Sequence, residues 1–266
     1  SPRLARTGFY LAPGATDALA APSSGAWSGN FWARTGCAVD ASTGRLACAT
    51  ADCGTSDVAC AGRGPAPPVT LAEITLAAPG GGGQDFYDVS LVDGFNLPLS
   101  IAPDKNGDGG ACRAAECAGD VNAVCPSDLR VVSGSGEVVA CKSACNAYGS
   151  ARYCCTGDYG TPAACGPTSY SQVFKAACPA AYSYAYDDAS STFTCAGGPD
   201  YTVTFCPGAT PRSASLSVPA LLHLTFQVRI WLVLALPKGA DLSQRSVTFR
   251  VIKMEEICRS ESSKIF

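Results

Sequence analysis

The sequence predicts a mainly β protein whose loops are cross-linked by disulfides. Only 15% of its 266 residues are charged, whereas it has 28 glycines and 18 prolines, a composition typical of loop-rich β proteins. The stretch at 84–98, QDFYDVSLVDGFNLP, alternates apolar and polar residues with the period of a half-buried strand. Sixteen cysteines at short and long spacings indicate a disulfide framework.

A hairpin is predicted from residues 70–77 and 85–92, which a glycine-rich turn connects. This pairing would bring Glu73 near Asp88, and Asp93, followed by glycine, then ends the second strand as a tight turn does. Buried carboxylates in a sheet cost free energy unless they face water or a partner. The carboxylates therefore indicate an acidic surface or cleft beside the sheet or, more simply, a solvated hairpin end.

No metal and no cofactor are predicted. Cysteine pairs such as Cys112 and Cys117 resemble zinc ligand pairs, but the other parts of a zinc module are missing and the single histidine, His223, lies in the C-terminal tail. Residues 104–116 match the first half of an EF-hand calcium loop. Because its twelfth position is Ala115 and no helix precedes it, we expect an ordinary polar loop.

Charge is unevenly distributed along the chain. Through Cys206 there are eleven Lys and Arg against eighteen Asp and Glu, a net charge of −7, whereas the last 60 residues carry +4. An acidic body disfavours nucleic acid and anionic membranes as partners. The cysteines require an oxidising compartment, so we expect a secreted, extracellular protein, although the sequence begins without a signal peptide.

A short helix is predicted after Thr168, which has the side chain of a good N-cap, because Tyr170, Val173 and Phe174 would share one face.

The C-terminal tail, 207–266, allows three interpretations. The apolar segment 218–236 is about long enough to span a bilayer, but Arg229 at a helix centre would cost roughly 2.5–3.5 kcal/mol. Alternation at 222–230 and 246–252 is instead strand-like. The tail is therefore an aberrant extension, a pair of strands or a membrane span, and membrane contact is expected only through 218–236.

Several motifs, in one order along the chain, resemble the thaumatin-like family, the plant defence proteins of pathogenesis-related group five. The resemblance runs from about Thr7 to Pro207. The motifs are TLAEITL at 70–76, DFYDVSLVDGFNLP at 85–98, CATADCG at 48–54, CPSDLRV at 125–131, YCCTGDYG at 153–160, YSYAYDDASSTFTC at 182–195 and YTVTFCPG at 201–208.

The resemblance implies a thaumatin-like β-sandwich with two disulfide-rich loop modules. The expected parts are a discontinuous core of residues 1–34, 75–118 and 179–206, a small stapled module at 35–74, a loop and helix module at 119–178, and the atypical tail. Family members begin with an earlier strand that carries the first cysteine. This sequence lacks that strand, so we expect an open sheet edge.

The family pattern also implies seven disulfides. They are Cys37–Cys48, Cys53–Cys60, Cys112–Cys195, Cys117–Cys178, Cys125–Cys141, Cys145–Cys154 and Cys155–Cys165. Cys206 would pair with the absent first cysteine, so we predict a free thiol there. The alternative is a bond to Cys258, if the tail folds back onto the body.

The family has an acidic cleft built from one Arg, one Glu and three Asp. By motif position Glu73 matches the Glu, Asp88 and Asp93 match two Asp, and Asp187 matches the third, with Asp188 as the adjacent candidate. Glu73 and Asp88 would be the catalytic carboxyls if the protein is active.

The arginine position of the cleft is occupied by Asn30, and Arg34 belongs to a different family position. Without a cation, at least one carboxyl pKa should rise. Such a carboxylic acid is what a glycosidase needs as proton donor. Aromatic residues near the carboxylates, Phe95 among them, suit sugar stacking or the core.

The resemblance thus implies a secreted, monomeric antifungal defence protein that binds β-1,3-glucan of fungal walls and is at most a weak endo-β-1,3-glucanase. The alternative is an ectodomain-like or structural member of the family, attached to a membrane through 218–236.

Overall fold

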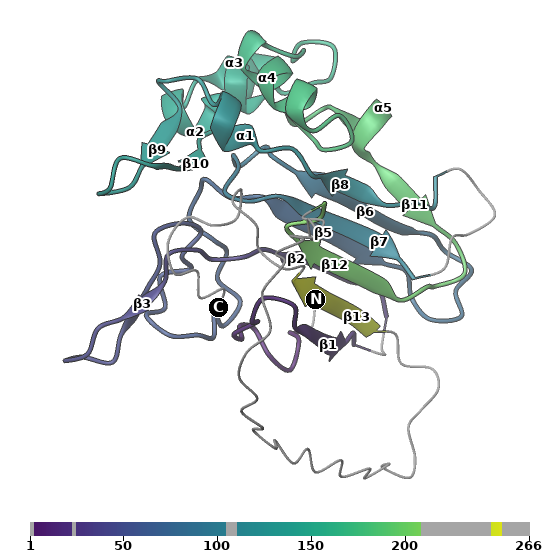
Figure 1. Ribbon diagram of the computed structural model, residues 1–266. Coiled ribbons are helices and arrows are strands. Elements are labelled where there is room, and N and C mark those ends of the chain that lie inside the picture. Colours follow the sequence, from purple (N-terminus) through teal and green to yellow (C-terminus); the bar gives the residue numbers. More distant parts are fainter. Residues whose placement is uncertain (1–2, 23–24, 105–110, 209–245, 252–266) are drawn as a thin grey trace, which may run out of the picture.

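The computed structural model describes residues 3–22, 25–104, 111–208 and 246–251. It has the mainly β fold expected from the sequence, with two large sheets and a helical module at one end of them (Figure 1). Within these residues there is no helix that is both long and apolar enough to cross a membrane.

The first sheet is antiparallel and has the strand order β11-β6-β5-β2. The predicted hairpin is confirmed as its centre, because β5 and β6 pair directly. The expected boundary between residues 74 and 75 falls inside β5, so this strand belongs to the sheet as a whole. The strands are β11 (Phe193–Cys195), β6 (Asp85–Ser90), β5 (Leu71–Leu76) and β2 (Trp27–Phe31).

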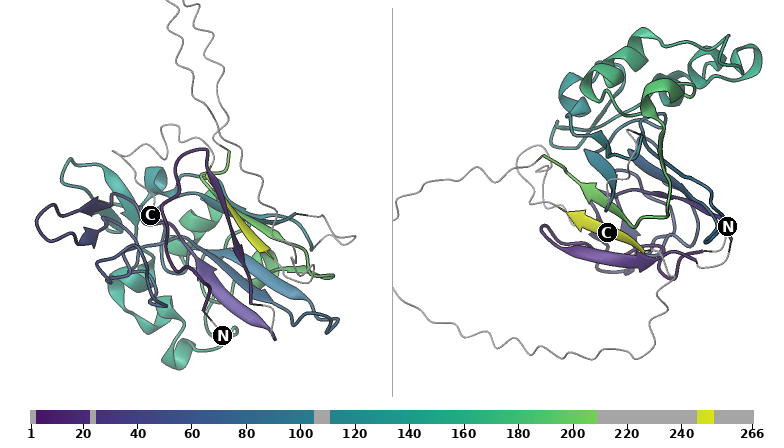
Figure 2. Two further views of the ribbon diagram at one scale, coloured as in Figure 1. Left: turned by 90° about the horizontal axis from the view of Figure 1, so that it is seen from below. Right: turned by 90° about the vertical axis from the view of Figure 1, so that its right-hand side faces the viewer.

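The second sheet has the order β1-β13-β12-β7-β8. Its unexpected member is β13, which lies between β1 and β12, antiparallel to the first and parallel to the second. Figure 2 shows β13 and β1 side by side. The strands are β1 (Thr16–Ala20), β13 (Ser246–Val251), β12 (Tyr201–Phe205), β7 (Leu99–Pro103) and β8 (Ala115–Cys117).

β13 bears on two of the expectations for the C-terminal tail, the strand-like alternation and the open sheet edge. The strand-like alternation at 246–252 is confirmed, and the expectation of an open edge is wrong, because β13 pairs with both β1 and β12. The segments 218–236 and 222–230 lie outside the described residues.

The two sheets pack face to face through alternate residues of each strand. In β5, Ala72, Ile74 and Leu76 are buried, whereas Thr75 on the other face is exposed. Across the interface, the rings of Tyr87 and Tyr201 have centroids 5.1 Å apart. This core leaves the opposite face of the first sheet available for polar side chains.

The helical module covers one end of the sandwich (Figure 2). Its best-defined helix, α4 (Ser169–Ala177), starts at Thr168, whose hydroxyl accepts from Ser171 N at 3.2 Å while Ser171 Oγ accepts from Thr168 N at 2.8 Å. The predicted cap is confirmed. The other elements are α1 (Val121–Val124), β9 (Arg130–Val132), β10 (Val138–Cys141), α2 (Ala144–Tyr148), α3 (Ala151–Cys154) and η1 (Gly157–Tyr159); α5 (Asp188–Ser191) follows the module.

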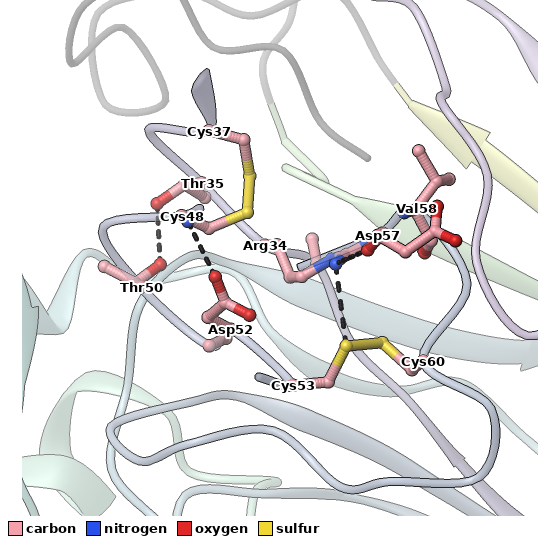
Figure 3. The surroundings of a disulfide bond; sticks show 12 residues. Arg34, Thr35, Cys37, Cys48, Thr50, Asp52, Cys53, Asp57, Val58 and Cys60 are labelled. Atoms are coloured by element: carbon pink, nitrogen blue, oxygen red, sulfur yellow. Dashed lines mark hydrogen bonds between the residues drawn. A yellow bond between two sulfur atoms is a disulfide. The ribbon is translucent and has the colours of Figure 1, made fainter. Parts of the chain in front are cut away.

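A small module beside the sheets contains β3 (Ala38–Val39) and β4 (Leu46–Ala47). Arg34 is buried at its base and donates to the carbonyl oxygens of Asp57 and Val58, next to the Cys53–Cys60 disulfide (Figure 3). The guanidinium therefore holds a loop in place through backbone oxygens, and burial lowers its pKa.

Seven disulfides have both of their cysteines within the described residues, and they are the same seven pairs that the resemblance implies. The prediction of a free thiol at Cys206 is wrong, because this cysteine is disulfide-bonded. Since every other described cysteine belongs to one of the seven pairs, the partner of Cys206 lies outside the described residues. The reason for the error is that β13 brings the C-terminal part of the chain to the sheet.

Candidate functional site

The register of the first sheet brings three predicted site residues into one row. Glu73 on β5 is directly opposite Asn30 on β2 and directly opposite Asp88 on β6. Their side chains are exposed or half-buried, whereas their sequence neighbours Phe31, Ala72 and Val89 face the core. Directly opposed side chains share one face of a sheet, so the three form a polar row on its outer surface. We call Glu73, Asp88 and the nearby Asp93 and Asp188 the acidic face.

Asp88 has the most perturbed carboxyl group on the acidic face. Burial raises its pKa to about 8, and the negative charges of Glu73 and Asp188 add to this effect. Its Oδ1 atom is buried and accepts no hydrogen bond. In the ionised form this oxygen would lack both water and a donor, so its surroundings favour the protonated carboxyl group.

Glu73 is also half-buried, and burial followed by the charge of Asp93 raises its pKa. Within the described residues the ion pairs are Arg6–Asp17 and Lys175–Asp187, and neither involves the acidic face. Asn30 supplies no charge, and Arg34 is committed to the small module. The sequence-based expectation that a carboxyl pKa rises where no cation is present therefore agrees with the geometry.

Asp93 occupies the turn after β6. The backbone there is tightly packed: Gly94 has φ +92°, and a Cβ on it would lie 2.6 Å from the carbonyl oxygen of Cys141. Asp93 O accepts from Val69 N at 3.0 Å, which fixes the turn against the start of β5. Asp93 thus has a defined position at the end of the acidic face.

Asp187 and Asp188 have different surroundings although they are adjacent. Asp187 Oδ2 accepts from Ser183 N at 3.0 Å and Ser183 Oγ at 2.8 Å, and it lies 3.0 Å from Lys175 Nζ. Asp188 instead accepts from the Tyr182 hydroxyl at 2.9 Å and acts electrostatically on Asp88. The predicted residue Asp187 is therefore held in a structural network, and the adjacent candidate Asp188 faces the site.

Phe95 does not belong to a sugar-binding surface, which corrects the sequence-based prediction. Its side chain is completely buried, because its backbone pairs with Cys141 in both directions and turns the ring into the core. Phe86 is the exposed aromatic residue of β6, two positions before Asp88 and on the same face. The period-two alternation of β6 already contains this signal, since Tyr87 and Val89 are the buried positions.

Tyr182, one of the aromatic residues that the sequence places near the carboxylates, is a further candidate site residue. Its hydroxyl contacts both Asp188 and Thr192, and burial, with Asp188 contributing, raises its pKa to about 12. A cavity of about 580 Å³ between residues 3–11, β2 and 60–65 borders the site through Asn30, but none of the four carboxyl groups lines it. The cavity and the acidic face therefore adjoin at Asn30.

In comparisons with known proteins, the matching family model and the similar proteins belong to one family. A model of the thaumatin family matches residues 1–207. "Thaumatin-like protein 1a" of Malus domestica is 57% identical over 206 residues, which are 77% of this chain and 81% of the relative. "Glucan endo-1,3-beta-glucosidase" of Prunus avium has the same identity and coverage. "Pathogenesis-related thaumatin-like protein 3.5" of Cryptomeria japonica is 56% identical over 77% of this chain and 80% of its own length.

Proposed function

The chain belongs to the thaumatin family, and from this premise we propose that it is a secreted defence protein that binds β-1,3-glucan on the acidic face. Similarity to pathogenesis-related relatives and to a relative named as a glucan endo-1,3-beta-glucosidase supports this substrate class. The disulfide-rich body suits an extracellular location.

The observation that carries the proposal is the unequal pair of opposed carboxyl groups. Burial raises the pKa of Asp88 to about 8, which favours its protonated form, and burial with the charge of Asp93 also raises the pKa of Glu73. One group can then donate a hydrogen bond to a sugar oxygen while the other accepts from a hydroxyl. Phe86 provides an exposed ring beside them, suited to the apolar face of a glucose unit.

The same pair supports slow hydrolysis as a secondary activity. Asp88 would protonate the glycosidic oxygen, and Glu73 would act as the second carboxylate. Directly opposed strand positions have Cβ atoms about 5 Å apart. This favours the short carboxyl separation of retaining enzymes, about 5–5.5 Å, over the wider one of inverting enzymes. Without a cation to orient the pair, we expect turnover to be weak.

The proposal is tested by measuring laminarin hydrolysis and retention on insoluble β-1,3-glucan with one preparation. The double variant Glu73→Gln/Asp88→Asn should lose at least tenfold in glucan affinity, because amides neither ionise nor protonate an oxygen. Glu116→Gln is the matched control, since this exposed carboxylate lies on β8 of the other sheet. Unchanged retention of the double variant would show that glucan binds elsewhere or not at all.

A further inference from the structure

Three tyrosine rings lie together on the helical module, one from each of three helices (Figure 1). Tyr148 is the last residue of α2, Tyr153 lies in α3 and Tyr170 is the second residue of α4. The ring centroids are 5.6 Å apart for Tyr148 with each of the other two, and 5.7 Å apart for Tyr153 with Tyr170. The Cys145–Cys154 disulfide joins α2 to α3, so the backbone holds these rings together.

Two of the three tyrosines share one carboxylate. The hydroxyls of Tyr148 and Tyr170 both donate to Asp128 Oδ2, that of Tyr170 at 2.6 Å, and the two hydroxyl oxygens lie 2.8 Å apart. The hydrogen bond from Tyr148, followed by that from Tyr170, lowers the pKa of Asp128. At neutral pH two phenols therefore lie beside an ionised carboxylate. No contact between the hydroxyl of Tyr153 and this carboxylate is described.

This geometry suits oxidation of the two phenols followed by their coupling. Loss of an electron makes a phenol release its proton, so a base that is hydrogen-bonded to the hydroxyl assists the step, and Asp128 has this position for both. Tyrosyl radicals couple through the ring carbons next to the hydroxyl. The rings of Tyr148 and Tyr170 converge at that end, since their oxygens are 2.8 Å apart and their centroids 5.6 Å apart. Tyr148 is 45% exposed, so an oxidant in solution can reach it.

We propose that Tyr148 and Tyr170 form an oxidative cross-linking site, at which a haem peroxidase with hydrogen peroxide joins the two side chains as dityrosine. Each phenol gives one electron to the oxidised peroxidase and one proton, through Asp128, to water. Half-buried Tyr170 is oxidised by passing a hydrogen atom to the radical of Tyr148, which the peroxidase then oxidises again.

The coupling step forms one carbon–carbon bond between the ring carbons next to the two hydroxyls. The hydrogen on each of these carbons is lost as the ring becomes aromatic again and a proton returns to each oxygen, so both hydroxyls are retained. The two electrons and two protons removed overall reduce hydrogen peroxide to two molecules of water. The product joins α2 to α4 by a bond that thiols do not cleave, whereas thiols do cleave the disulfides of this module.

The site is tested by treating the unmodified protein, at several concentrations, with a haem peroxidase and hydrogen peroxide. Dityrosine fluorescence gives the rate, and peptide mass after reduction and alkylation gives the position. Trypsin releases Tyr148 on peptide 143–152 and Tyr170 on peptide 153–175. These peptides should be recovered joined, less two hydrogens, with fragment ions that place the bond at Tyr170. Because the two groups are held together in one chain, the rate should not depend on protein concentration.

Three results would overturn the proposal: no dityrosine, a bond at another tyrosine, or covalent dimers as the main product. Tyr148→Phe should abolish the joined peptides. Tyr159→Phe is the matched control and should leave them unchanged, since Tyr159 is a 36% exposed tyrosine of the same module for which no contact with another tyrosine is described.

The part played by the carboxylate has its own variant. Asp128→Asn keeps the shape of the side chain but removes the base, so cross-linking should be roughly tenfold slower or more. An unchanged rate would refute the role of Asp128 as proton acceptor. Far-ultraviolet circular dichroism and the seven disulfide pairs show whether each variant has folded. If Tyr148→Phe does not fold, the peptide map of the unmodified protein still decides whether the bond forms.

Discussion

Asp88 and Asp187 are two half-buried carboxyl groups of one molecule with opposite surroundings. Asp187 has a lysine and hydrogen-bond donors within reach, among them Ser183 and Ser190. Asp88 has other carboxylates as neighbours and a buried oxygen without a donor. A paired group of this kind stabilises the fold, whereas an unpaired one destabilises it and is a candidate for a functional role. The difference distinguishes the structural carboxylate from the candidate functional one more clearly than their positions in the sequence do.

Of the changes predicted here, removal of the Lys175 cation beside Asp187 should have the largest effect. In Lys175→Met, Asp187 keeps its charge but loses its ion pair, and the carbonyl of Ala181 and the hydroxyl of Ser191 lose a donor. We expect about 2–3 kcal/mol lower free energy of unfolding, measured in urea. Lys142→Met, an exposed lysine without such a network, is the control and should change stability little. Equal losses in both would remove the distinction between the two regions.

Asp88 should make stability fall as pH rises. Its folded pKa, about 8, exceeds the unfolded value near 4, so the folded state holds the extra proton between these limits. Its contribution is complete below about pH 4 and is lost as pH approaches 8. After allowance for partial exposure, we expect on the order of 2 kcal/mol. Asp88→Asn should flatten this part of the profile, and an unchanged slope would assign the pH dependence to other groups.

Asn30→Arg would give Glu73 and Asp88 a nearby cation, as Lys175 is for Asp187. A cation next to Glu73 should lower the pKa of Glu73 and Asp88 by about 1 unit each. Carboxyl ¹³C chemical shifts followed through a pH titration measure this directly. The size-matched control is Asn30→Gln, which adds no charge. If both variants leave the two pKa values in place, position 30 does not act on the acidic face.

Tyr182→Phe should have the smallest effect. The change removes the hydroxyl that donates to Asp188 and leaves the ring in place. We expect about 1 kcal/mol lower stability and a measurable loss of glucan affinity, because Asp188 loses its orientation. Tyr184→Phe, for which no hydroxyl contact to these carboxylates is described, is the comparison. If Tyr184→Phe loses glucan affinity and Tyr182→Phe does not, the hydroxyl of Tyr184, rather than that of Tyr182, contributes to binding.

The sequence was informative where local periodicity sets the structure. The alternation in 70–77 and 85–92 predicted the hairpin and therefore the opposition of Glu73 and Asp88. It was uninformative where a residue that is distant in the sequence determines the surroundings of a side chain. Lys175 determines that Asp187 rather than Asp188 joins the structural network, and the backbone of Cys141 turns Phe95 inward. Long-range pairing likewise explains the error at Cys206, because β13 pairs with both β1 and β12 and so brings the C-terminal part of the chain to the sheet.

The position of β13 also determines when the protein can finish folding. Asp17 pairs with Phe249, about 230 residues later, so this contact cannot form until the ribosome has synthesised the chain beyond Phe249. The hairpin of β5 and β6 can form much earlier, since its two strands are neighbours in sequence. Until β13 has been synthesised, β1 and β12 therefore have edges that lack this partner. In that interval the nascent chain can most readily pair with strands of other molecules.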